Sequence, residues 1–389
     1  MTIAVLDKFI YYCLLLYALL SSITIAGTNI AISMAALAAI IRYFREPITI
    51  NLDQRLVKAI FVFLSAALLS AIFAYYPLDG IKTTANYLYR MLPLFLAAAF
   101  IRNKQQLFQI IAVTAISLAL ADSVAIWRGL SGNFRAHGFG GNYMVMAGFL
   151  LQMIPLLLVI SLEGSFLSNK YRAACFAVFF LSCIALVYNG TRGVWIAVGL
   201  TIPLGLICIK TNKKQAVSLL VLLCISAVLL MQIPVINDRV HSITDMNNQS
   251  NSERILLWQS SWHMFLDHPL TGIGTGNFEE LYVDRYMSPL AKEKLTNAHS
   301  IYMNALGEMG AIGFSAFIFL FGYILYQSYC KMKCPSQRIW GLAALLFTLS
   351  LLIQGFTQTN FIDSAVIRMY WFLLGVMQAA YHLEESENV

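Results

Sequence analysis

The sequence predicts an all-α polytopic membrane protein with about twelve transmembrane helices. Hydrophobic residues make up 59% of its 389 positions and charged residues only 12%, whereas soluble domains carry roughly 25% charged residues. The mean hydropathy is +0.71. Apolar runs recur along the chain at close to the length of about 20 residues that crosses a bilayer. Polar side chains are too few to cover a water-soluble surface, which excludes the soluble and disordered classes. The counts of 23 glycines and 9 prolines are ordinary and exclude a collagen-like chain.

The apolar runs divide the chain into three segments. We expect a first transmembrane bundle of about nine spans over residues 1–234, a polar loop with amphipathic helices over 235–300, and the last three spans with a short tail over 301–389. The predicted spans lie near 9–26, 28–44, 56–76, 84–101, 107–127, 141–161, 171–188, 193–210, 215–234, 301–326, 338–358 and 363–382.

The placement of lysine and arginine predicts the orientation. If the N-terminus is cytoplasmic, each loop on that side is basic and the opposite loops hold fewer cations, as the positive-inside rule requires. Both termini are then cytoplasmic and the 235–300 loop faces outward. This distribution also accounts for the net charge of +7, so no nucleic-acid partner is predicted. The residues predicted on the cytoplasmic side are Lys8, Arg42, Arg45, Arg55, Lys58, Arg102, Lys104, Lys170, Arg172, Lys210, Lys213, Lys214, Lys331, Lys333 and Arg338.

Within the outward loop, the stretch SERILLWQSSWHMFLDHP predicts an amphipathic helix. We expect Ser252 to cap its start and Pro269 to end it, because serine favours the N-cap and proline cannot continue a helix. The residues at helical spacing that predict its apolar face are Ile255, Leu256, Trp258, Trp262 and Phe265.

Three outward residues are candidates for catalysis. Arg192 lies in VYNGTRGVWIA and Arg254 in NSERILLW. A snorkelling or ion-paired arginine would explain each one structurally, but the planar guanidinium also suits a diphosphate. His299 lies where the loop enters the next span. It is either an interfacial side chain or a general base, since a neutral imidazole can take a proton from a hydroxyl near pH 7.

Further outward cations are weaker candidates for binding an anionic substrate. They are Arg128, Arg135 and Arg368, together with His137 in RAHGFGGN. Each is individually better explained as interfacial, although together they give the outer surface an unusual positive charge. His263 and His268 are five residues apart, whereas helical metal pairs are three or four apart, so no metal site is predicted.

A motif around His299 resembles the O-antigen ligase family. Its signature of His, then Asn, Ser or Gln, nine residues and G-x-x-G is matched by His299, Ser300, Gly310 and Gly313. The stretch PLTGIGTGNF is similar to the glycine turn of that family, and NGTRG to its arginine-bearing loop.

The resemblance implies a GT-C-type glycosyltransferase in the cell inner membrane, with its active site facing the periplasm. It further implies an undecaprenyl-diphosphate-linked O-antigen as donor, a lipid A-core sugar as acceptor, contact with membrane lipid, and no metal or cofactor. On this resemblance, the two arginines and the histidine of the family are Arg192, Arg254 and His299.

Three alternatives stay open. An O-antigen polymerase would perform the same chemistry on a lipid-linked acceptor, and a protein O-oligosaccharyltransferase belongs to the same superfamily. A polytopic lipid-glycan transporter belongs to another class. Transporters place ionisable groups near mid-membrane, where this sequence has only Asp122 and Glu308.

Overall fold

The computed structural model describes residues 2–164, 167–210 and 212–386, which leaves the end of the predicted tail outside the described part. Within those residues the regular structure is helical throughout and no β-strand occurs. The helices are α1 (Ile3–Leu20), α2 (Ile25–Tyr43), α3 (Gln54–Ile72), α4 (Pro77–Phe100), α5 (Lys104–Leu130), α6 (Tyr143–Glu163), α7 (Asn169–Asn189), α8 (Arg192–Cys208), α9 (Lys213–Leu230), α10 (Pro234–His241), α11 (Gln249–Asp267), α12 (Phe278–Leu281), η1 (Tyr282–Tyr286), α13 (Ile301–Lys333), α14 (Arg338–Gln354) and α15 (Ser364–Ser386).

Each predicted apolar run overlaps mainly with one helix, and the chain is a multi-pass membrane protein. The predicted boundary of the first run is wrong, because 9–26 extends past Leu20, where α1 ends, into α2. Among the described residues, 8 helices are long and apolar enough to cross a membrane, and α8 and α14 are shorter apolar helices. The helices α4 and α15 are long but carry charged side chains such as Arg90 and Arg368. The all-helical membrane class is confirmed, whereas the count of twelve spans and the GT-C type stay predictions.

The core forms around α6 and α15. From Met146 to Glu163 every residue of α6 is buried, as expected of a helix that is apolar on all sides. Glycine allows α15 to pack closely against α6 and α4. A Cβ added at Gly148 of α6 would lie 2.4 Å from the Val366 side chain of α15, and one at Gly375 of α15 would lie 2.6 Å from the Leu94 carbonyl oxygen of α4. Helices of the predicted last segment therefore pack into the predicted first bundle.

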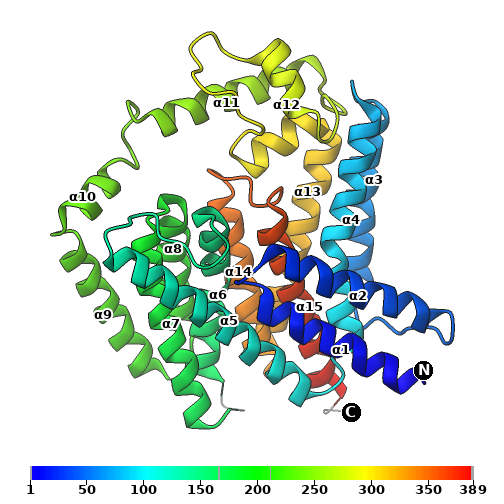
Figure 1. The fold of residues 1–389 in the computed structure, drawn as a ribbon, viewed down its shortest axis with the longest axis vertical. Coiled ribbons are helices and arrows are strands. Elements are labelled where there is room, and N and C mark those ends of the chain that lie inside the picture. The colour runs from blue at the N-terminus through cyan, green and yellow to red at the C-terminus, as the bar shows by residue number, and fades with distance from the viewer. Residues whose placement is uncertain (1, 165–166, 211, 387–389) are drawn as a thin grey trace.

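Loops that the charge pattern predicts on one side of the membrane contact one another. The Asp7 carboxylate pairs with Arg42 at 3.1 Å and with Arg102 at 2.7 Å, and Glu163 pairs with Arg338 at 3.3 Å. The start of α1 and the end of α15 lie at the lower end of the bundle in Figure 1, and α11 and α12 lie at its upper end. The structure therefore separates a basic end, where α1 begins and α15 ends, from the end that carries the polar loop.

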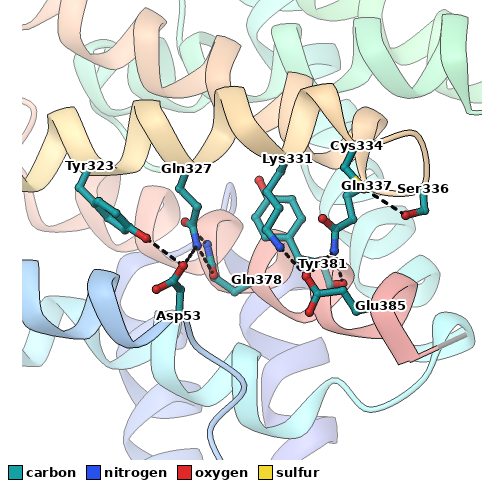
Figure 2. A network of polar contacts seen from close by, with 10 residues as sticks. All are labelled: Asp53, Tyr323, Gln327, Lys331, Cys334, Ser336, Gln337, Gln378, Tyr381 and Glu385. Carbon is teal, nitrogen blue, oxygen red and sulfur yellow. Dashed lines mark hydrogen bonds and ion pairs between the residues drawn. The ribbon is translucent and has the colours of Figure 1, made fainter. Parts of the chain in front are cut away.

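A polar network fastens α13 at the basic end (Figure 2). The Asp53 carboxylate, at the start of α3, accepts hydrogen bonds from Tyr323 at 2.8 Å and Gln327 at 3.3 Å. The Gln327 amide also exchanges hydrogen bonds with Gln378 of α15, and Lys331 pairs with Glu385. Contacts to α3 and α15 thus fix this end of α13, the helix whose other end carries the histidine motif.

The amphipathic helix forms as α11, but two details of its prediction are wrong. Its N-cap is Asn248, whose side chain accepts a hydrogen bond from the Ser250 amide, and not Ser252. Trp262 is 47% exposed, although it was expected on the buried face. The buried positions include Ser261 because α11 packs closely on α13, where a Cβ added at Gly307 would lie 3.2 Å from the Ser261 carbonyl oxygen. Small residues suit this approach better than tryptophan does.

Candidate active site

Four arginines line one cavity at the polar-loop end of the bundle. The cavity has a volume of about 110 Å³ and lies between the α5–α6 loop, the start of α8, α10, α11 and the α14–α15 loop. These segments surround the area between α8 and α11 in Figure 1. Five separate segments of the sequence therefore build one site. The arginines are Arg135, Arg192, Arg239 and Arg254.

The NGTRG motif places Arg192 at the first turn of α8. Gly190 ends α7 in the left-handed conformation, with φ 65°, which glycine adopts without strain. The Asn189 side chain anchors the turn by donating to the carbonyl oxygens of Ala136 at 3.1 Å and Tyr143 at 2.8 Å. The short connection leaves the Arg192 guanidinium facing the cavity instead of extending along a span.

The polar loop holds the Arg192 guanidinium in place. One of its terminal nitrogens, Nη1, donates to the Ser242 hydroxyl at 3.0 Å and also to the Ser242 carbonyl oxygen. The other, Nη2, donates to Asn251 Oδ1 at 3.1 Å. These neutral partners orient the side chain but leave its charge uncompensated.

Arg254 enters the cavity from α11, one turn after Asn251. Its Nε donates to the Thr357 carbonyl oxygen at 3.1 Å and its Nη1 to the Ser250 hydroxyl at 3.0 Å. Burial lowers the pKa of Arg254, and the charge of the nearby Arg192 lowers it further. The two guanidinium groups predicted from the motif are thus electrostatic neighbours in one cavity.

Arg239 and Arg135 complete the cluster. Arg239 Nε donates to the Gly190 carbonyl oxygen at 3.3 Å, and Arg135 donates to the Tyr143 hydroxyl at 3.2 Å. Burial lowers the pKa of Arg239, and the charges of Arg135 and Arg192 lower it further. Sequence reasoning named Arg135 but missed Arg239, which the sequence shows only as one charge in a polar loop.

The positive charge of this cluster is not balanced by a carboxylate of the described residues. Across the described residues, none of the four arginines forms an ion pair with an aspartate or glutamate. Like charges that converge in a partly buried site repel one another and weaken each other's hydration. An anionic ligand with several oxygens would relieve that repulsion, and guanidinium groups bind phosphate oxygens in bidentate geometry.

His299 lies beside the cavity, immediately before the Ser300 cap of α13. Its Nδ1 lies 3.3 Å from Oε1 of Gln358, a cavity-lining residue on the α14–α15 loop. Burial lowers the pKa of His299, the hydrogen bond to Gln358 raises it, and the charge of Arg254 lowers it. The structure therefore brings the three predicted catalytic residues together and adds Gln358, which no motif or charge pattern had indicated.

Backbone strain marks the same site. Among the described residues, the non-glycine residues with positive φ are Arg135 at 80° and His299 at 46°. Such conformations cost energy and persist only where surrounding contacts hold them, commonly at functional sites. The His299 amide donates to Asn297 Oδ1 at 3.0 Å, and the Thr359 hydroxyl donates to the same oxygen at 2.8 Å. These two hydrogen bonds to Asn297 hold the strained backbone at His299 in place.

The G-x-x-G glycines open α13 so that the glycine turn can dock. At Gly310 the backbone leaves the helical conformation, with φ 60° and ψ −163°. The freed amides of Ala311 and Ile312 donate to the Pro269 and Leu270 carbonyl oxygens at 2.8 and 3.1 Å. The family-like turn is therefore bound, backbone to backbone, to the helix that follows the histidine.

Glu308 fastens the other side of that turn. Its carboxylate accepts from the Phe278 amide at 3.2 Å and from Asn304 Nδ2 at 3.0 Å. The Asn304 side chain in turn accepts from the Ala298 amide at 3.2 Å. This chain of contacts connects the glycine turn to the residue before His299, which gives Glu308 a positioning role that the sequence left open.

Of the four weaker candidates, Arg135 lines the cavity and the other three lie outside its lining. Arg128 donates to the carbonyl oxygens of His137 at 3.0 Å and Gly138 at 2.7 Å, and it contacts the His137 ring. Arg368 is buried on α15, where it donates to the Ser364 carbonyl oxygen at 2.8 Å and to Asn29. Arg128 and His137 thus fasten the α5–α6 loop, and Arg368 joins α15 to α2.

Part of the chain matches a known protein family. Residues 177–318 match the family model described as O-antigen ligase. This segment is therefore similar to the O-antigen ligase family, as the histidine motif predicts. No curated protein matches the chain. The matched segment contains Arg192, Arg239, Arg254 and His299 together with both glycines of the motif, whereas Arg135 and Gln358 lie outside it.

Proposed function

We propose that this protein transfers a glycan from undecaprenyl diphosphate to a sugar hydroxyl of lipid A-core, at the periplasmic face of the inner membrane. The O-antigen ligase family consists of glycosyltransferase-like membrane enzymes that act on lipid-linked glycans and lipid acceptors. The observation that carries the proposal is the cavity in which four arginines without an acidic partner lie beside a histidine.

The arginines would bind the diphosphate and stabilise it as it leaves. A diphosphate is already a good leaving group, so the site needs charge stabilisation more than it needs a strong acid. Guanidinium groups fixed by neutral partners meet the developing charge without reorganising, and they act more strongly in a partly buried site than in water. Arg192 and Arg254 are the principal candidates, and Arg135 and Arg239 extend the same surface.

His299 would act as the general base. Because Gln358 Oε1 can only accept a hydrogen bond, its contact requires the proton on Nδ1 and leaves Nε2 free. Nε2 takes the proton of the acceptor hydroxyl as its oxygen attacks the anomeric carbon. The bond from that carbon to the diphosphate oxygen breaks, and its electron pair leaves with the diphosphate. This single displacement inverts the anomeric configuration.

Transfer by the purified protein tests the proposal. The protein is incubated with undecaprenyl-diphosphate-linked glycan and lipid A-core, and the capped product is measured for the wild type, His299→Ala and His263→Ala. His263, an exposed α11 residue, is the matched histidine control. We expect product with the wild type and the control and none with His299→Ala. Full transfer by His299→Ala would overturn the role of His299.

Lipopolysaccharide from a deletion strain distinguishes the proposed function from the related polymerase reaction. Loss of the capped ladder with accumulation of long lipid-linked glycan would support the ligase reaction. Accumulation of single lipid-linked repeat units would contradict it and indicate the polymerase reaction. The same site chemistry serves both reactions, so only the acceptor separates them.

A further inference from the structure

A second cavity lies at the opposite end of the bundle from the arginines. It has a volume of about 650 Å³ and lies between the end of α6 and the starts of α7 and α9, at the lower left in Figure 1. The 21 residues of α7 separate it from the Gly190 turn of the candidate active site, about 30 Å at the rise of an α-helix. The two cavities are therefore distinct sites.

The α7 wall of this cavity changes from polar to apolar along the helix. Asn169 and Arg172 line it in the first turn, and Phe176 and Phe180 line it one and two turns further on. These residues follow helical spacing and so share one face of α7. The wall is polar at the end of the span and apolar toward the middle.

The α9 wall changes in the same direction. Gln215 and Ser218 line the cavity near the start of α9, and Leu219 and Leu222 line it deeper. Only 11% of the apolar window of α9 is buried within the protein, and the helix packs mainly against α8. The two walls together match the profile of a phospholipid, in which a polar headgroup is followed by acyl chains.

The lining of the cavity carries a positive charge at its polar end. Arg172, the basic residue among the lining residues that the structure describes, is half-buried, and its guanidinium donates to the Ser161 and Leu162 carbonyl oxygens at 3.2 and 3.0 Å. Lys170 and Lys213 do not line the cavity but are exposed in the first turns of the two helices that do. None of the lining residues that the structure describes is acidic.

The Glu163 carboxylate, which follows the lining residue Leu162 in the sequence, does not neutralise this positive charge. Glu163 is buried, pairs with Arg338 at 3.3 Å and accepts a hydrogen bond from the Lys210 amide. In addition, neither α7 nor α9 has a side-chain hydrogen bond at its N-cap. The first-turn amides of both helices therefore remain available to an anion, which the helix dipoles also favour.

We propose that this cavity binds an anionic glycerophospholipid of the surrounding bilayer. Its phosphate lies beside Arg172, within the positive field of the exposed Lys170 and Lys213 at the starts of the same helices, and an acyl chain lies between Phe176 and Leu222. Basic pockets between transmembrane helices are suited to anionic headgroups, and the excess of positive charge favours an anionic lipid over a zwitterionic one. Bound lipid would fill the space between α7 and α9 and so hold α9 to the bundle.

Native mass spectrometry of the purified full chain tests the proposal. The protein is incubated with phosphatidylglycerol and phosphatidylethanolamine of identical acyl chains, and the lipid retained on each species is compared. We expect preferential retention of phosphatidylglycerol. At about a fivefold loss of affinity per lysine removed, the double variant Lys170→Gln/Lys213→Gln should lose most of that preference. Lys58→Gln, an exposed lysine of α3, is the matched control and should keep it.

A cavity-filling variant separates this site from general lipid contact. Ser218→Trp places a large side chain at an exposed, lining position and should reduce retention of both lipids. Phosphatidylglycerol should also raise the melting temperature of the wild type and of Lys58→Gln, because a ligand that binds only the folded state stabilises it. It should not raise the melting temperature of Lys170→Gln/Lys213→Gln or of Ser218→Trp. Equal retention of the two lipids, or variants that behave like Lys58→Gln, would overturn the proposal.

Discussion

Replacing Gly310 by alanine tests how the G-x-x-G motif supports the site. With φ 60° and ψ −163°, Gly310 occupies a region that is essentially restricted to glycine, where another residue costs about 1–3 kcal/mol. A Cβ there would lie 2.5 Å from the Leu270 carbonyl carbon and oxygen and 2.6 Å from the Gly272 nitrogen. These atoms belong to backbone and cannot rotate away, so the glycine turn must leave α13.

Displacing the turn also breaks hydrogen bonds. The amides of Ala311 and Ile312 donate to it, and each bond contributes about 0.5–1.5 kcal/mol. With the strain included, we expect Gly310→Ala to destabilise this region by about 2–6 kcal/mol. Because the turn is connected through Glu308 and Asn304 to the Ala298 amide, which precedes His299, glycan transfer should fall as well.

The measurements are thermal unfolding of the purified protein, limited proteolysis of the 269–277 turn and the transfer assay. Gly322 in the same helix provides the control, because a Cβ added there would have no heavy atom within 4 Å. Gly322→Ala should be neutral or stabilising by up to about 1 kcal/mol, since alanine favours helix. If Gly310→Ala and Gly322→Ala have the same melting temperature and the same protease sensitivity in the 269–277 turn, the docking role assigned to Gly310 is wrong.

Four further predictions concern the site. Arg254→Lys should lower the transfer rate by about 10²-fold because lysine lacks the planar fork, and near-normal turnover would contradict bidentate binding. Arg239→Gln should raise the donor KM and lower the rate about tenfold, whereas Arg285→Gln, at an exposed position of the same loop, should behave as wild type in the same kinetics. Burial lowers the pKa of His299 from its ordinary value of 6.5, so the neutral base persists at pH 7. A pH–rate profile should therefore be level from about pH 7 to 8 and fall on acidification below about 6.5; a rate that rises on acidification would exclude a neutral imidazole base. Finally, excess EDTA should leave transfer unchanged if the arginines alone meet the diphosphate charge, and restoration of a lost rate by Mg²⁺ would refute that account.

The fold class could be predicted from the sequence because hydropathy is summed along the chain and needs no knowledge of tertiary partners. Long apolar stretches form helices in a membrane, since every backbone polar group must be satisfied within the segment. The Lys/Arg pattern likewise predicted which segments lie on the same side of the membrane. The structure brings such segments into contact, as the ion pairs of Asp7 with Arg42 and Arg102 show. The histidine motif predicted the resemblance to the O-antigen ligase family, and the match of residues 177–318 to that family model agrees with it.

What the sequence determined was therefore the helical membrane class, the grouping of loops by charge and the motif residues Arg192, Arg254 and His299. Only the tertiary structure decided that Arg239 and Gln358 join them, that Arg128 fastens a loop, and which face of α11 is buried. The physical reason is that hydropathy and motif spacing are local along the chain. A charge cluster and a close helix contact depend instead on which distant segments pack within a few ångströms of one another.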